Sequence, residues 1–544
     1  MTDIEIPLEK DRKGHYRFFE ILPGFLSWLL LFLPIILTFI NVDIAVIFIL
    51  AYLIIYFVRT LGFDVRAVSG YRTFKKYMKL DWEGLCEDLN NGQVTKKDIM
   101  RPAWHNKNLR SYKNFETTYH PNEVIHAVII ATVNESKEVL KPTLDSLISG
   151  TYDSRKLLIV IAYEGRAGAE TEQRVNDLIK EYKSNFKDMI SFKHPPGIPD
   201  EIIGKGGNIS FAGRGLHEYL KKNELPIDKV LVTTLDADNR PDKRYFSALS
   251  YLFCVVPNPH RASFQPLPMF TNNIWDAPTL MRVIATSNNI FYIVQTQRPH
   301  LVRNFSAHAQ SMKSLIELNF WSARSVVEDG HHYWRSYFYY EGDYRVYPLS
   351  IPIYMDAVLA DGYVKTLKAQ FIQLRRWTYG ASDVAYIADK GYFHKNSISK
   401  WDVTKNLLRT LESHVTWATG TVLVFFAAFI PPFFRAQSIA AEQLPFIVSR
   451  IQQIGIIGLL ASVYVCLLTL PPRPDRYKRR RSALMVLQWV IAPVSSIVYG
   501  SLAAFNSQTR LILKKYPTRF DVTEKAVITS SGETVSTKAD PTKA

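Results

Sequence analysis

Cysteine is scarce in this chain of 544 residues, and its distribution excludes two kinds of structure. The three cysteines, Cys86, Cys254 and Cys466, lie far apart and none belongs to a CxxC pair. Neither a disulfide framework nor a cysteine zinc site is therefore expected. Acidic residues are outnumbered by basic ones, 50 against 66, which gives a net charge of +16. No nucleic-acid module accompanies this excess. Much of it flanks apolar segments, where attraction to anionic lipid headgroups explains it more simply, so no nucleic-acid partner is expected.

The N-terminus lacks the features of a secretory signal. Residues 1–20 mix both charge signs, whereas a signal has a basic start and a cleavage site of small residues. The apolar segments 21–40 and 44–58 follow, separated by a very short connection. The first is about as long as the roughly 20 residues that a membrane-spanning helix needs. We therefore expect both segments to remain in the mature protein as a helical hairpin.

The C-terminal part contains three more apolar segments. Segments 415–434 and 451–470 carry no charged residue, so no ion pathway is evident in them. Segment 482–505 is long enough to span but contains Pro493. The loop before it, "PPRPDRYKRRR", has six basic residues and one acidic residue. The positive-inside rule places this loop, the N-terminus and the middle of the chain in the cytoplasm. If segment 482–505 crossed fully, the basic tail would lie outside, against the same rule. A re-entrant or interfacial pair of short helices would keep the tail inside and is the favoured of the two alternatives.

The middle of the chain alternates short apolar runs with helical patterns. The runs at 123–132, 156–163 and 229–235 predict strands, and the patterns at 136–149, 169–187 and 208–222 predict helices. Continuous apolar runs are typical of strands buried on both faces of a parallel sheet. The alternation predicts a doubly wound α/β domain with a mostly parallel sheet.

Around this domain the sequence predicts five further parts. They are a transmembrane hairpin (1–60), an amphipathic connector along the membrane (61–120), an interfacial helix (397–414), a second transmembrane region (415–506) and a cytoplasmic, partly disordered tail (507–544), with the α/β domain at 121–396. In the segment 397–414, Trp401, Leu407, Leu408 and Leu411 lie near one helical face. A surface helix packed on the domain explains that pattern equally well. The last stretch, 529–544, is polar and predicts disorder.

Acidic and amide side chains follow the predicted strands. Asn134 and Glu135 come after the first strand, Glu164 ends the second, and Asp236 and Asp238 end the third. Ligands of an open parallel sheet bind beyond the carboxyl ends of its strands. Carboxylate oxygens on such a turn suit Mg²⁺ or Mn²⁺, which also bind substrate phosphates.

Two downstream motifs add candidate residues. "VVEDGHHYWR" contains Glu328 and Asp329, and its aromatic surroundings could desolvate a carboxylate and make it a general base. A solvated acidic turn is the alternative for such a pair. "QLRRW" (373–377) combines guanidinium groups, which suit a diphosphate, with a tryptophan face, which suits a sugar ring or a base. A basic edge of the membrane would explain the arginines but not Gln373 and Trp377.

The ordered set "ATVNE" (131–135), "KGGNIS" (205–210), "DAD" (236–238), "FTNN" (270–273), "VED" (327–329) and "QLRRW" (373–377) resembles glycosyltransferase family 2. It is most similar to the membrane-embedded branch with cellulose, hyaluronan and chitin synthases. The similarity runs from about 124 to 380. It implies a GT-A fold, which is Rossmann-like, and inverting transfer of a hexose from a nucleotide-diphosphate sugar with Mg²⁺ or Mn²⁺.

The resemblance also implies a role for each matching residue. Asp329 would be the catalytic base, Asp238 would bind the metal, Trp377 and Asn272 would contact the acceptor, and Asn134, Glu135, Glu164, Lys205, Asp236, Gln373 and Arg376 would contact the donor. The chain departs from the family pattern at two positions. Val133 stands where an aromatic residue would stack on the base, and Glu164 stands alone where the family has an acidic pair. Both departures weaken the prediction that the base is uracil.

Three functions remain open from the sequence. The first is extension of a polysaccharide, with passage of the product through the chain's own helices in a multi-pass protein, expected in the plasma membrane. The second is single transfer to a membrane lipid, since some lipid glycosyltransferases have a related motif. The third is a non-catalytic membrane scaffold or transport component, which the intact acidic motifs and "QLRRW" disfavour.

Overall fold

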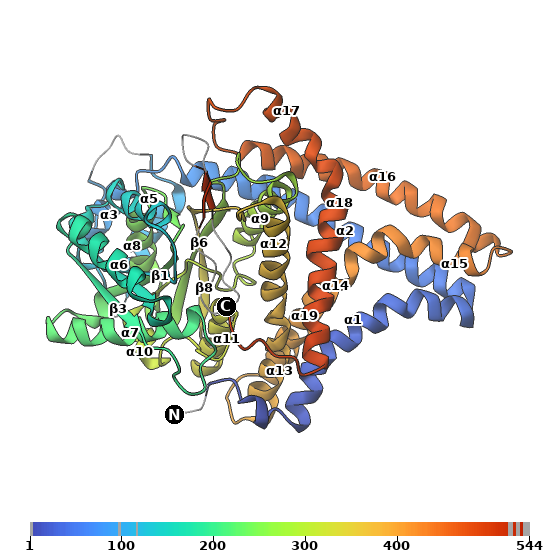
Figure 1. Ribbon diagram of the computed structural model, residues 1–544, viewed down its shortest axis with the longest axis horizontal. Coiled ribbons are helices and arrows are strands. Elements are labelled where there is room, and N and C mark those ends of the chain that lie inside the picture. The colour runs from blue at the N-terminus through green and yellow to red at the C-terminus, as the bar shows by residue number, and fades with distance from the viewer. Residues whose placement is uncertain (1–3, 96–99, 116–117, 521–525, 529–533, 537–544) are drawn as a thin grey trace.

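The computed structural model describes residues 4–95, 100–115, 118–520, 526–528 and 534–536. Figure 1 shows a layered region of sheet and helices beside a group of long helices that extends away from it. We call the layered region, residues 121–396, the sheet domain, and the long helices the hydrophobic helices. The segment 529–544, predicted to be disordered, lies outside the described residues except for 534–536.

The sheet domain is built on an eight-stranded sheet with the order β3-β2-β1-β4-β7-β6-β8-β5. Its strands are β1 (Ile125–Thr132), β2 (Leu157–Glu164), β3 (Asp188–His194), β4 (Val230–Asp236), β5 (Arg240–Pro241), β6 (Ala262–Phe270), β7 (Ala309–Ser311) and β8 (Arg345–Met355). The pairs β3–β2, β2–β1, β1–β4 and β6–β8 are parallel. The short strands β7 and β5 pair antiparallel with their neighbours. The predicted α/β domain with a mostly parallel sheet is confirmed.

Helices cover both faces of this sheet. They are α5 (Lys137–Ile148), α6 (Ala169–Tyr182), α7 (Lys205–Lys222), α8 (Tyr245–Val255), α9 (Thr279–Thr296), α10 (Met312–Glu317), α11 (Glu328–Tyr339), α12 (Tyr363–Thr378) and α13 (Asp383–Ala388). Along β1, Val128 and Ile130 pack in the core that includes α5 and α8. The intervening Ile129 packs in a second core, which includes α7 and α10. Alternate residues of the same strand thus reach opposite cores, which explains why the run is apolar throughout.

Among the described residues, five helices are long and apolar enough to cross a membrane. They are α1 (Gly14–Ile40), α2 (Val42–Tyr77), the helix Lys400–Phe434 that begins as α14 (Lys400–Phe426) and ends as α15 (Ile430–Phe434), α16 (Ile439–Leu468) and the run Arg480–Ile512. Many of their large apolar side chains are exposed in the protein alone, among them Phe25, Ile47 and Ile457. Side chains of this kind are stable in contact with lipid rather than water. These helices support a membrane protein.

The run Arg480–Ile512, which includes α17 (Arg480–Leu487), α18 (Ala492–Ser495) and α19 (Leu502–Ile512), differs from the other four. It is helical throughout, so the prediction of two short helices is wrong. Its first half contacts α9, where Arg282 Nε donates to Gln488 Oε1 at 2.7 Å. Its second half contacts α12, where Thr378 Oγ1 donates to the Ala503 carbonyl at 3.3 Å. Figure 1 shows the run passing across the direction of α15 and α16. Because it also contacts α1 and α14, it lies between the sheet domain and the hydrophobic helices.

Two other segments differ from their sequence expectations. Helices α3 (Trp82–Asn91) and α4 (Ala103–Tyr112) contact α8 of the sheet domain, and Leu85 and Leu89 are fully buried there. This part of the connector belongs to the sheet-domain core rather than lying along the membrane, as Figure 1 also shows for α3. The expected interfacial helix 397–414 is instead the first part of α14, continuous with the next apolar segment.

Candidate active site

Lys205 lies at the centre of the candidate site, at the start of α7. Its Nζ is 2.8 Å from Asp236 Oδ1, at the end of β4, and 3.7 Å from Glu328 Oε1, in the first turn of α11. It also donates to Ser306 Oγ at 3.1 Å. Burial alone would lower the pKa of Lys205, but nearby carboxylates raise it, so the ammonium group stays charged. The lysine thus joins two motifs that are about 90 residues apart, which the sequence alone did not connect.

Gly206 allows α7 to begin close to α11. A Cβ atom at this position would lie 2.4 Å from the Ser322 carbonyl oxygen and 3.3 Å from Glu328 Cβ. The first contact is with backbone, which cannot turn away, so only glycine fits without a shift of the chain. The "KGG" motif therefore positions Lys205 against the acidic pair.

The acidic pair Glu328 and Asp329 occupies the first turn of α11. Burial raises the pKa of Glu328, and the neighbouring Asp329 adds to the effect, while Lys205 opposes it. Burial also raises the pKa of Asp329, against Lys205 and the Gly330 N–H, which donates to Asp329 Oδ1 at 2.7 Å. A carboxylate with a raised pKa is a better general base because it holds a proton more strongly. The proton-accepting role of Asp329 stays a prediction.

Asp238 lies next to a residue that the sequence interpretation missed. Its Oδ2 accepts a hydrogen bond at 3.0 Å from the backbone N–H of Asp356, the residue directly after β8. Asn272 Nδ2 donates to the Asp238 carbonyl at 3.0 Å, so Asn272 lies at this end of the site. The signal for Asp356 was present: an acid at the end of a strand parallel to its neighbour. It was missed because the run with Pro348 and Pro352 does not resemble a strand.

The donor set at Asp238 fits a hard divalent cation. Carboxylate oxygens are the ligands that Mg²⁺ and Mn²⁺ prefer. Within the described parts of the chain, no three His, Cys, Asp or Glu side chains gather as a ready cation site. Mg²⁺ usually binds through one or two carboxylates and completes its shell with water and substrate phosphates. One or two aspartates at the strand ends therefore fit a cation that is bound together with a diphosphate.

Two residues predicted to contact the donor make other interactions. Glu135 Oε2 accepts from Thr132 Oγ1 and from the Val133 N–H, both at 2.7 Å, so it holds its own turn together. Glu164 Oε2 lies 3.2 Å from His194 Nδ1, and His194 Nε2 lies 3.1 Å from Glu201 Oε2. Burial opposes protonation of His194, but the two glutamates outweigh it and raise its pKa to about 9. Glu164 is thus part of a charged cluster at the ends of β2 and β3.

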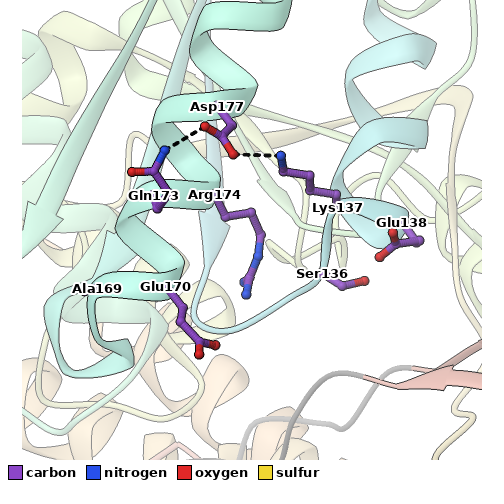
Figure 2. A pocket seen from close by; sticks show the side chains of 8 residues that line it. All are labelled: Ser136, Lys137, Glu138, Ala169, Glu170, Gln173, Arg174 and Asp177. Carbon is purple, nitrogen blue, oxygen red and sulfur yellow. Dashed lines mark hydrogen bonds and ion pairs between the residues drawn. The ribbon is translucent and has the colours of Figure 1, made fainter.

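An open pocket of about 600 Å³ lies between the starts of α5 and α6, the helices that follow β1 and β2. Figure 2 shows Lys137 bonded to Asp177 across it, and Gln173 bonded to the same Asp177 along α6. Arg174, on its wall, donates to the Glu135 carbonyl at 2.7 Å. Asn134 lies near it as well, where Oδ1 accepts from Thr171 Oγ1 at 3.4 Å. The pocket therefore borders the loop that carries Asn134 and Glu135.

The "QLRRW" motif occupies the last turns of α12. Gln373 Oε1 accepts from Gln370 Nε2 at 3.1 Å. The positive charge of Arg376 lowers the pKa of Glu328 and Asp329, against the effect of burial. The Trp377 ring lies 6.2 Å from that of Phe270, at the end of β6. The helix that carries the motif also contacts α19, in the run Arg480–Ile512.

Phe520 is a second residue near the site that the sequence interpretation did not identify. Its N–H donates to the Ile203 carbonyl at 2.7 Å, and its ring centroid lies 3.6 Å from Arg376 Cζ. Gly204, with φ +159°, faces it closely: a Cβ there would lie 2.3 Å from Phe520 Cβ. No local pattern announced this contact, because it joins the C-terminal segment to a loop more than 300 residues earlier.

No family model and no curated protein sequence matches the chain. Several solved structures are similar to it. The mannosyltransferase PcManGT from Pyrobaculum calidifontis, in complex with GDP-Man and Mn²⁺, is 14% identical with a TM-score of 0.37, covering 83% of this chain and 99% of that one. S. aureus TarS 1-349 in complex with UDP-GlcNAc is 10% identical with a TM-score of 0.34, covering 76% and 96%. GalNAc-T7 with UDP, GalNAc and Mn²⁺ is 10% identical with a TM-score of 0.31, covering 54% and 58%. At such TM-scores the likeness carries no argument about this chain.

Proposed function

We propose that the protein is an inverting membrane glycosyltransferase of the family 2 type, which moves a sugar from a nucleotide-diphosphate sugar to a growing polysaccharide. The observation that carries the proposal is the convergence of Lys205, Asp236 and the acidic pair Glu328–Asp329. A cation between carboxylates at the ends of sheet strands suits a donor with a charged diphosphate, and a desolvated carboxylate beside it suits a general base.

In the proposed reaction Asp329 accepts the proton of the acceptor hydroxyl while the hydroxyl oxygen bonds to the anomeric carbon. The bond from that carbon to the diphosphate oxygen breaks, and its electron pair leaves with the nucleoside diphosphate. Because attack comes from the face opposite the leaving group, the anomeric configuration inverts. Lys205 and Arg376 supply positive charge toward the diphosphate, which stabilises the leaving group.

Asp238 would hold a Mg²⁺ or Mn²⁺ ion, with Asp356 close to it. The bound ion would supply positive charge to the leaving diphosphate. Asp236, whose charge is balanced by Lys205, would contact the nucleotide part of the donor. Asn134, beside the pocket between α5 and α6, would contact the nucleoside.

The acceptor would enter along α12, toward the membrane. The ring centroids of Trp377 and Phe270 are 6.2 Å apart. The ring of Tyr292, on α9, is also 6.2 Å from that of Phe270. Aromatic faces are suited to sugar rings. With the sheet domain on the cytoplasmic side, such a series would lead a growing chain toward the hydrophobic helices and across the membrane. The contact between α12 and α19 also favours a second candidate, transfer of one sugar to a lipid acceptor in the bilayer.

The purified protein, reconstituted in lipid, should be given a panel of nucleotide sugars with Mn²⁺, and the products analysed by mass spectrometry. We expect one donor to yield a polymer that a specific glycosidase digests. A glycolipid with one sugar would support the second candidate instead. Absence of transfer from every donor would contradict the enzymatic proposal.

Replacement of Trp377 by alanine is expected to impair acceptor use more than donor hydrolysis. Loss of one stacking face should lower transfer to acceptor by about two- to tenfold, since aromatic contacts contribute about 0.5–1.5 kcal/mol beyond burial. Donor hydrolysis to water should fall less than twofold. Trp401→Ala is the matched control, because Trp401 on α14 is 72% exposed. Equal loss of both reactions would exclude stacking on the acceptor.

A further inference from the structure

The loop between α16 and α17, residues 469–479, is bonded to the sheet domain through Arg476 and Tyr477. Arg476 Nη2 lies 2.6 and 2.7 Å from the two carboxylate oxygens of Asp276. Tyr477 OH donates to the same carboxylate at 2.6 Å. Next to them, Arg481, in the first turn of α17, donates to the Trp275 carbonyl at 2.8 Å. Charge-assisted bonds of this kind, several to one short segment, fix the loop against residues 271–277.

Three other basic residues of the same stretch are accessible to a partner outside the protein. Lys478, Arg479 and Arg480 are exposed, and within the described residues no ion pair to them is found. Asp475 is the one acidic residue in the stretch, and it is also exposed. Three adjacent cations, with a single acidic residue in the same stretch, repel one another, so they favour an anionic partner.

The helix that follows exposes an apolar surface beside these cations. Leu484, Leu487, Val490 and Val494 are exposed, with exposed fractions between 47% and 81%. At helical spacing they form one apolar stripe, and Arg480 lies at its start, four residues before Leu484. The opposite face is buried and includes the polar residues Gln488 and Ser495. A helix with its apolar face outward and cations at its end is suited to the boundary between headgroups and acyl chains.

Residues 271–277, which the basic loop contacts, also reach the candidate active site. Residues 271–277 include Asn272, whose side chain donates to the Asp238 carbonyl, and Asn273, whose side chain pairs with both backbone groups of Ala357 at 2.7 and 2.9 Å. Trp275 Nε1 donates to the Pro471 carbonyl at 3.1 Å, so the segment is held from the loop side as well. One short segment is thus bonded both to the basic loop and to the residue proposed to bind metal.

We propose that Lys478, Arg479 and Arg480 bind the phosphate-bearing headgroups of anionic phospholipids, and that this binding holds residues 271–277 in place beside Asp238. The headgroups neutralise the three cations and anchor the start of α17 at the membrane surface. The loop is then less free to move, and Arg476 and Tyr477 stay on Asp276. The headgroup site does not rest on the proposed function. Only the description of Asp238 as a metal ligand does.

The first test is lipid binding by the whole protein in detergent, titrated with phosphatidylglycerol or with phosphatidylcholine and followed by native mass spectrometry. We expect the Lys478→Gln, Arg479→Gln, Arg480→Gln triple variant to bind phosphatidylglycerol on the order of 10²-fold more weakly, since each basic residue near an anionic surface contributes about fivefold and the three contributions multiply. Binding should also weaken with added salt. The matched control replaces three exposed lysines of the sheet domain, Lys180, Lys187 and Lys222, by glutamine. Equal phosphatidylglycerol binding by both triple variants would overturn the headgroup site.

The second test is hydrogen exchange of residues 271–277 in nanodiscs of phosphatidylcholine alone or with about one third phosphatidylglycerol. The wild-type protein should exchange severalfold more slowly in the anionic nanodisc, and the triple variant should show no difference between the two. Inorganic phosphate added to the neutral nanodisc should not reproduce the slowing; if it does, the site recognises free phosphate rather than lipid. Unchanged exchange in the wild-type protein would overturn the coupling. Neither test needs transfer activity, so failure of the enzymatic proposal would remain distinguishable.

Discussion

Asp329→Asn is expected to reduce sugar transfer by on the order of 10²–10⁴-fold, because an amide cannot accept the proton of the acceptor hydroxyl. The change keeps the size of the side chain and its position in the first turn of α11. Binding of the nucleoside diphosphate should stay within about twofold, since Lys205 bonds to Asp236 and not to Asp329 at hydrogen-bonding distance. Turnover and calorimetric binding of the nucleotide, measured on the same preparation, separate the two effects.

The same variant has an electrostatic consequence that can be read from pH profiles. Burial raises the pKa of both carboxyl groups of the pair, so each is protonated at a higher pH than an exposed acid. The base works only when deprotonated, and kcat/KM of the wild-type protein should therefore fall as the pH decreases through this raised pKa. Asp329→Asn removes one negative charge, which should lower the pKa of Glu328.

Asp343→Asn is the matched control for this prediction. Asp343 is exposed and pairs with Arg261 away from the site, so its replacement should leave both the rate and the pH profile unchanged. Retained turnover in Asp329→Asn would exclude this residue as the base. A loss of nucleotide binding equal to the loss of turnover would point to a role in donor binding instead.

Asp238→Ala is expected to remove the metal dependence of nucleotide binding. Replacing even a residue that only supports a metal ligand weakens metal affinity by about 10–100-fold, so loss of a direct ligand should exceed that range. Titration of Mn²⁺ in the presence of a nucleoside diphosphate, followed by calorimetry, measures the effect. Transfer should fall by at least about 10²-fold, because the charge on the leaving diphosphate is no longer stabilised.

Asp153→Ala is the control for the metal prediction. Asp153 lies just before β2, at the opposite edge of the sheet, and its side chain is 40% exposed. It should titrate with Mn²⁺ as the wild-type protein does. An unchanged Mn²⁺ titration in Asp238→Ala would show that the cation binds elsewhere.

Sequence patterns predicted the central strands well and the outer ones poorly. The strands β1, β2 and β4 are buried on both faces, so they read as continuous apolar runs. The strand β3 was not predicted, because Ser191 and Phe192 are half-buried and Lys193 is exposed, so its residues do not form a continuous apolar run. The strands β6 and β8 carry prolines, and their pairing shifts register between Pro266 and Leu267. Proline removes a donor from the ladder and argues against a strand, which hid Asp356.

The candidate site was predictable to the same extent. Strand-end acids follow from local sequence, and Asp236 and Asp238 lie where the runs predicted them. The bonds of Glu135 to its own turn and of Glu164 to His194 could not be inferred, because a carboxylate has several possible partners within reach. Those choices depend on side chains that the fold brings together from different strands.

By itself, the sequence determined the apolar helices, the α/β alternation and the acids at strand ends, because these depend on local periodicity and on burial. Tertiary structure alone decided that the run Arg480–Ile512 lies between the sheet domain and the hydrophobic helices, that Lys205 bridges Asp236 and Glu328, and that Arg476 grips Asp276. Arg476 and Asp276 are 200 residues apart. Such pairs form because separately folded elements pack against each other, and no local pattern encodes the distance between them.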